Sequence, residues 1–114
     1  MDLSDFVNGA IVATSTTVAT SKITINAPAR VGMRVYLIWA SFSTDLVGAF
    51  DAQGGVAGAT SKLQQRTQVA VAAYVNPNLE PAMAIPISDS GIEANFVLNV
   101  TTTGRLSVVY GYGP

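Results

Sequence analysis

Apolar and polar residues alternate along most of this chain in short runs, which is the pattern of β-strands rather than of helices. In 22–26, Ile23 and Ile25 alternate with polar residues, so a strand there has one apolar face. β-branched residues are dense over 10–20, and turn residues separate the runs at intervals of roughly 8–12 residues. The pattern predicts an all-β fold, an antiparallel β-sandwich of jelly-roll type with about eight short strands.

The middle of the chain gives mixed signals. The valine spacing in 62–75 favours a strand over the helix that its alanine and glutamine content also permits. The glycine-rich stretch 51–61 is expected to be a surface loop, because no strand-to-helix context supports a phosphate-binding role. In 83–88, Pro86 removes a backbone donor from a short strand, which places this strand at a sheet edge or a bulge.

The strongest strand signal runs from Met33 to Ser43. Strict alternation gives this strand two faces, and both are apolar. Because an antiparallel sheet normally exposes one face to water, the strand must be covered twice, either by its own chain or by a partner. The two predicted faces are Met33, Val35, Leu37 and Trp39 on one side and Tyr36, Ile38, Ala40 and Phe42 on the other.

The last third of the chain alternates most regularly. Apolar residues recur at every second position in 96–100 and again in 106–112, and Thr103 and Gly104 form a turn between the two segments. These segments are predicted to pair as a terminal hairpin.

Residues 1–8 are interpreted as an N-terminal arm, and residues 9–114 as a single β-sandwich domain, because 114 residues leave room for one core. A free arm would expose Phe6. The arm therefore either folds back onto its own domain or docks on a neighbouring subunit.

Composition narrows the function. Hydrophobic residues make up 49% of the chain. Charged residues make up only 11%, whereas ordinary soluble domains have about 25%. The apolar runs fall far short of the roughly 20 residues of a membrane-spanning helix, and a net charge of -1 argues against nucleic acid as a partner. The absence of His and Cys excludes Ser-His-Asp and Cys-His catalysis. No catalytic site, cofactor or metal is expected.

The remaining chemical groups have structural alternatives. Paired carboxylates can hydrolyse glycosides, and folding could bring together Asp45 and Asp51, or Asp89 and Glu93, but Asp also suits turns. Exposed aromatic rings can stack on sugars, and the candidates are Trp39, Tyr110 and Tyr112. Their alternating positions favour packing in a core or an interface instead.

The segments Ala94–Gly104 and Arg105–Tyr112 resemble the closing hairpin of small jelly-roll proteins of tailed-bacteriophage particles, and the likeness extends to the strand Ala84–Ser88 before them. These are the capsid decoration, or cement, proteins. The resemblance implies a homotrimer that binds the outside of a phage head, stabilises the shell and catalyses no reaction. It also implies the major capsid protein as partner and the capsid surface of the virion as location, after synthesis in the host cytoplasm.

A surface poor in charge loses little to desolvation on association, which favours a structural role. The alternative from a different class is a carbohydrate- or receptor-binding β-sandwich of a phage fibre or tail. Arg30 and Arg34 flank the start of the apolar strand, where they are solvated or pair with acidic groups of a neighbour. The residues expected in the core or at a subunit interface are Phe6, Tyr36, Trp39, Phe42, Tyr110, Tyr112, Arg30 and Arg34.

Overall fold

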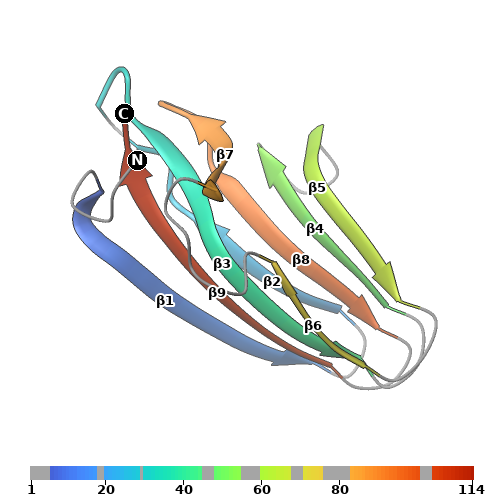
Figure 1. The fold of residues 1–114 in the computed structure, drawn as a ribbon. Helices are drawn as coiled ribbons and strands as arrows, with labels where there is room; N and C mark the ends of the chain where they lie inside the picture. Colours follow the sequence, from blue (N-terminus) through green and yellow to red (C-terminus); the bar gives the residue numbers. More distant parts are fainter. Residues whose placement is uncertain are drawn as a thin grey trace.

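The computed structural model describes residues 6–17, 20–28, 30–44, 48–54, 60–67, 71–75, 83–100 and 104–114. Within these ranges the chain is almost entirely β-strand, arranged in two antiparallel sheets that stack face to face (Figure 1). The all-β antiparallel sandwich expected from the alternation is confirmed. The described part contains no helix with the length and apolarity to cross a membrane.

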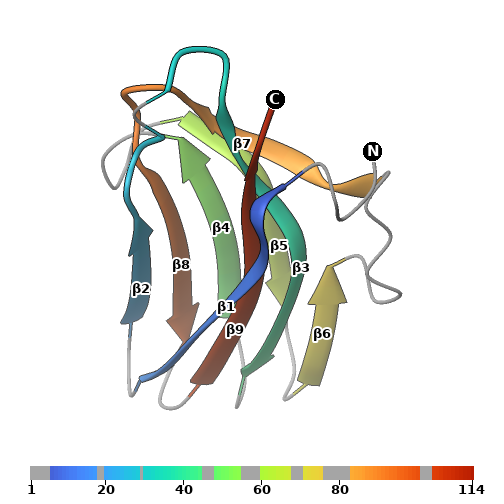
Figure 2. The same ribbon diagram turned by 90° about the vertical axis from the view of Figure 1, so that its left-hand side faces the viewer.

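One sheet has five strands and the other has four (Figure 2). The five-stranded sheet consists of β1 (Val7–Thr17), β9 (Gly104–Gly113), β3 (Arg34–Thr44), β6 (Val71–Val75) and β7 (Ile85–Asp89). The order is β1-β9-β3-β6, and β7 pairs with β3 beside β6. In the four-stranded sheet the order is β2-β8-β4-β5, formed by β2 (Thr20–Ile25), β8 (Ala94–Val100), β4 (Gly48–Gly54) and β5 (Thr60–Thr67).

The main core lies between the two sheets. Phe42 of β3 and Phe50 of β4 stack across it, with ring centroids 5.5 Å apart and an interplanar angle of 18°. The predicted inward faces of 22–26 and of the last two strands are confirmed, since Ile25, Phe96 and Leu106 lie in this core. Its other buried members are Val35, Leu37, Ala40, Phe42, Phe50, Ala52, Val75, Ile87, Ala94, Leu98 and Val108.

The faces predicted for β3 are correct only up to Ile38. Leu37 is opposite Tyr110 of β9, but Trp39 is opposite Val109, so Ile38 is an extra residue in β3. Such a β-bulge lets two successive side chains share a face and reverses the alternation that follows. Trp39 therefore faces outward, and Ala40 and Phe42 face the main core, opposite to the prediction from strict alternation.

The predicted terminal hairpin is wrong. β8 pairs with β2 and β4, whereas β9 pairs with β1 and β3 in the opposite sheet. Alternation identifies which side chains face a core but does not identify the neighbouring strand. The resemblance to a closing hairpin thus rests on a polarity pattern that two strands of different sheets share.

Two boundaries also differ from the prediction. β4 continues through Asp51 to Gly54, where a surface loop was expected, and Asp51 and Ala52 are buried. β1 begins at Val7, before the boundary expected at Gly9. Residues 1–5 lie outside the described residues, so an arm formed by them stays a prediction.

The strand expected around Pro86 is confirmed, and it is both an edge strand and bulged. β7 pairs only with β3 among the described strands, and its register shifts between the pairs Val35–Ser88 and Tyr36–Pro86, which leaves Ile87 as an extra residue. The region 62–75 is strand rather than helix where it is described, in β5 and β6. The β7 bulge also positions a small pocket beside β3.

The stack between the sheets predicts a large effect of Phe50→Ala. Removing a fully buried ring from a packed core lowers the free energy of unfolding by about 3–5 kcal/mol, which urea denaturation measures. Val31→Ala is the control, because Val31 is 91% exposed and surface changes stay within about 0.5 kcal/mol. Equal stability of the two variants would contradict the stacked core.

Candidate interaction surface

The outward face of the five-stranded sheet carries a second apolar cluster, called here the outer cluster. Its buried members are Phe6, Tyr36, Ile38 and Val109, with Trp39 and Ala84 packed against them and partly buried. Because β3 contributes to both clusters, Val35 to Ile38 are buried on both faces by the chain itself. The double covering expected for this strand therefore comes, over these residues, from within the fold.

Phe6 closes one end of the outer cluster. It is 4% exposed, and its ring meets that of Tyr36 edge to face at a centroid distance of 5.6 Å. Tyr36 Oη donates a 2.6 Å hydrogen bond to the carbonyl oxygen of Pro114, which satisfies the polar tip of a buried tyrosine. Of the two alternatives for Phe6, the structure has the residue folded back onto its own domain.

Gly111 makes room for this packing. A Cβ atom added at Gly111 would lie 2.8 Å from Cδ1 of Phe6, closer than two carbon atoms in contact. The glycine in β9 is thus required by the close approach of the aromatic ring.

Three large side chains beside the outer cluster are partly or largely exposed. They are Trp39, Tyr74 and Met83, and are called here the aromatic margin. The rings of Trp39 and Tyr74 lie 6.1 Å apart, tilted by 45°. Tyr74 is 53% exposed and Met83 is 64% exposed, and Met83 directly precedes Ala84 of the outer cluster. Large apolar side chains left exposed beside a packed cluster are typical of interaction surfaces.

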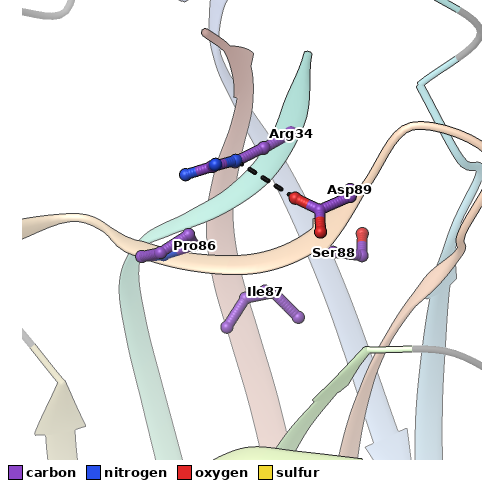
Figure 3. A pocket seen from close by; sticks show the side chains of 5 residues that line it. All are labelled: Arg34, Pro86, Ile87, Ser88 and Asp89. Carbon is purple, nitrogen blue, oxygen red and sulfur yellow. Dashed lines mark ion pairs between the residues drawn. The ribbon is translucent and has the colours of Figure 1, made fainter. Parts of the chain in front are cut away.

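A small polar pocket lies on the same flank of β3, at the β7 bulge (Figure 3). Its volume is about 210 Å³, and its lining residues are Arg34, Pro86, Ile87, Ser88 and Asp89. Arg34 Nε is 3.1 Å from Asp89 Oδ1, with the Arg34 side chain 49% exposed and the Asp89 side chain 70% exposed. An exposed ion pair of this kind contributes at most about 1 kcal/mol to stability.

The carboxylates are dispersed over the described residues. Asp89 pairs with Arg34, whereas Glu93 accepts a hydrogen bond from Asn95 Nδ2 at 3.4 Å. Asp51 is buried in β4 rather than in a turn, and Asp45 lies outside the described residues. No three acidic side chains in the described part come close enough together to hold a metal ion.

The residues expected in a core or interface are placed in three environments. Phe42 belongs to the main core, and Tyr110 and Tyr112 pack against it while staying partly buried. Phe6, Tyr36 and Trp39 form or border the outer cluster. Arg30 and Arg34 are exposed, and Arg34 pairs with Asp89 of its own chain.

Alternation along the chain does not single out Tyr74, Met83 or Ser88. Tyr74 lies in a short strand whose neighbours are alanine and valine, so its position opposite Ser41 of β3 depends on strand pairing. Met83 and Ser88 flank Pro86. The proline was a signal for an irregular edge, but it did not indicate which side chains gather there.

The sequence matches no protein-family profile and no curated protein. Among solved structures, the chain is similar to one titled "Bacillus endospore appendages form a novel family of disulfide-linked pili", with a TM-score of 0.41 and 11% identity over 99% of this chain and 98% of that chain. At this TM-score the likeness carries no argument about function, and the fold rests on the strand pairing described above.

The Gly111 contact predicts a coupling between two substitutions. Gly111→Ala forces Phe6 to move and should lower the free energy of unfolding by about 1–3 kcal/mol, as overpacking does. In a Phe6→Ala background the added methyl group has space, so the same substitution should cost little. Urea denaturation of the two single variants and the double variant measures this coupling, and an equal cost in both backgrounds would contradict the placement of Phe6.

Tyr112 predicts a loss of stability at alkaline pH. Its Oη donates a 3.0 Å hydrogen bond to the carbonyl oxygen of Asn26, and burial, followed by the nearby Tyr110, raises the pKa of Tyr112. Above about pH 10 the unfolded chain releases this proton while the folded chain retains it, so stability falls as the pH rises through the folded pKa.

Tyr112→Phe should remove this part of the alkaline fall, with urea midpoints compared at about pH 8 and about pH 11. Tyr74→Phe is the matched control, since Tyr74 is more than half exposed. If Tyr112→Phe and the parent protein lost the same stability over this range, the assignment to Tyr112 would be wrong.

Proposed function

We propose that this protein is a non-enzymatic structural subunit, a capsid decoration protein that binds the outside of a phage head as a homotrimer and stabilises the shell. The observation that carries the proposal is the aromatic margin, which leaves Trp39, Tyr74 and Met83 partly or largely exposed in a chain with 11% charged residues. Aromatic residues and methionine are enriched in protein interfaces, and charged residues are depleted there.

The order of the strands supports the proposal that this is a viral structural protein. The chain crosses between the sheets so that β1, β9, β3 and β6 face β2, β8, β4 and β5. Two four-stranded antiparallel sheets with such crossing connections form a jelly roll, a fold common in viral capsid proteins. This strand order supports the jelly-roll type for the sandwich, with β7 as an additional strand beside β6.

The low charge of the chain supports the proposal that it assembles as a trimer and binds a shell. Apolar and neutral polar groups lose less hydration free energy than ions when they enter an interface. The margin on one copy is small, but a trimer would present three copies of it to a repeating shell. Linked contacts bind far more tightly than one contact alone.

A second function, sugar binding by a fibre or tail protein, is favoured by one observation. Trp39 and Tyr74 place two partly exposed rings side by side on an outer sheet face. Tyr110 and Tyr112, the other sugar-stacking candidates, pack against the main core instead. A platform for glycans would therefore consist of Trp39 and Tyr74.

The test combines light scattering after size exclusion with co-sedimentation on purified phage heads that lack their own decoration proteins. We expect a mass three times that of one chain and saturable binding to the heads. The double variant Trp39→Ser, Tyr74→Ser should lose at least about tenfold in head binding, or should dissociate into monomers.

Val31→Ser is the matched control, because Val31 is also an exposed apolar residue, at 91%, but lies in the turn before β3. Circular dichroism and urea midpoints establish that each variant is folded. A monomer that binds no head would overturn the proposal, and saturable glycan binding that Trp39→Ser abolishes would favour the second function.

A further inference from the structure

β1 forms one border of the five-stranded sheet. It is eleven residues long and pairs antiparallel with β9, and no other described strand pairs with it (Figure 1). In an antiparallel sheet, every second residue of a border strand directs its N–H and C=O groups away from the sheet. The side of β1 away from β9 therefore presents a row of backbone donors and acceptors.

The pairing with β9 divides β1 into an irregular start and a regular end. The register shifts between Val7 and Ile11, and seven consecutive pairs then run from Ile11 to Thr17. An irregular register bends and twists a strand, which makes that part a poor partner for another strand. The part of β1 that suits further pairing is therefore 11–17.

The other border strands have features that discourage pairing between molecules. β2 contains Lys22, and β7 contains Pro86. β5 contains both Lys62 and Arg66. β6 has neither a charged residue nor a proline, but it is only five residues long. Lysine, proline and short length are means by which native proteins protect sheet borders, and the segment 11–17 of β1 has none of them.

The sequence of β1 is compatible with pairing to a second copy of itself. No charged residue occurs from 6 to 21, so two copies of this strand meet without opposing like charges, which destabilise a strand pair. The segment 11–17 reads Ile-Val-Ala-Thr-Ser-Thr-Thr. Ile, Val and Thr all have high strand propensity, and cross-strand pairs of threonines add to the stability of a sheet.

We infer that β1 pairs antiparallel with β1 of a second copy, centred near Thr14, so that two five-stranded sheets become one continuous sheet. Two identical antiparallel strands are related by a two-fold axis, the commonest symmetry of soluble oligomers. Backbone hydrogen bonds across this axis supply the affinity. With the centre at Thr14, Ile11 of one copy lies opposite Thr17 of the other.

This contact is separate from the aromatic margin. In the order β1-β9-β3-β6, β1 and the strand that carries Tyr74 lie at opposite borders of the sheet (Figure 2). A copy paired through β1 therefore leaves the margin available for other contacts. The inference goes beyond the proposed structural role, because it requires neither a trimer nor a shell.

The first test measures the mass of the full chain by sedimentation equilibrium, at concentrations from about 1 μM to about 1 mM. We expect the mass at the highest concentration to be at least twice that at the lowest. Thr14→Lys places like charges opposite each other at the axis and should prevent this rise. Thr24→Lys is the matched control and should retain the rise, because Thr24 is an exposed threonine in β2, a border strand of the other sheet.

A mixture of charge variants separates loss of pairing from loss of folding. Thr14→Glu alone should also abolish the rise, for the same reason as Thr14→Lys. An equimolar mixture of the two variants should restore it, because opposite charges then meet across the axis. Two variants that had simply unfolded would not restore each other.

Cysteine cross-linking locates the axis, since the chain has no cysteine of its own. Single cysteines are introduced one at a time at each position of 12–16 and oxidised at high protein concentration. We expect the yield of covalent dimer to peak at or next to Thr14→Cys, where the Cα atoms of the two copies lie closest. Thr24→Cys is the control and should give little dimer.

Three results would overturn the inference. These are a mass that does not rise with concentration, a rise that Thr14→Lys and Thr14→Glu both retain, and dimer yields at 12–16 no higher than that of Thr24→Cys. The mass at the lowest concentration tests the trimer, whereas the rise tests the pairing of β1. Each proposal can therefore fail without the other.

Discussion

One extra residue in β3 controls how both faces of the five-stranded sheet are built. Ile38 has no counterpart in β9, so Leu37 before it and Phe42 after it both face the main core, while Trp39 faces outward. Burying one large apolar side chain contributes about 1.5–3 kcal/mol. If Ile38 were instead paired in regular alternation, Trp39 would face into the sandwich and Phe42 would face out of it. The stack with Phe50 and the outer cluster both depend on this bulge.

The high hydrophobic content of the chain is explained largely by two apolar layers rather than one. The main core fills the space between the sheets, and Phe6, Tyr36, Ile38 and Val109 form the second layer on the outside. A partner is thus not needed to cover the first half of β3. What remains for an interface is the narrower aromatic margin, which suits an assembly held together by several small contacts rather than by one large apolar surface.

Local alternation made the strands predictable, whereas long-range pairing did not follow from it. Ile25, Phe96 and Leu106 face the core as their spacing predicts, and Pro86 marks both an edge and a bulge. The alternation around Ile38 gives no sign of the bulge, because apolar residues occupy every position from Val35 to Ala40. The pocket groups come from two strands far apart in sequence, β3 and β7, so Ser88 and Arg34 are brought together only by the register of the sheet.

The flank of β3 opposite β9 is divided between two strands of five residues each. β7 pairs with Arg34 to Leu37 and β6 with Ala40 to Thr44, and Pro86 withholds a backbone donor from β7. A strand from another molecule pairs most readily with a long, straight edge strand whose backbone N–H and C=O groups are all unpaired. Over the described residues, this border is short, stepped and interrupted by a proline, so it is a poorer template for amyloid-like stacking than a long straight edge would be.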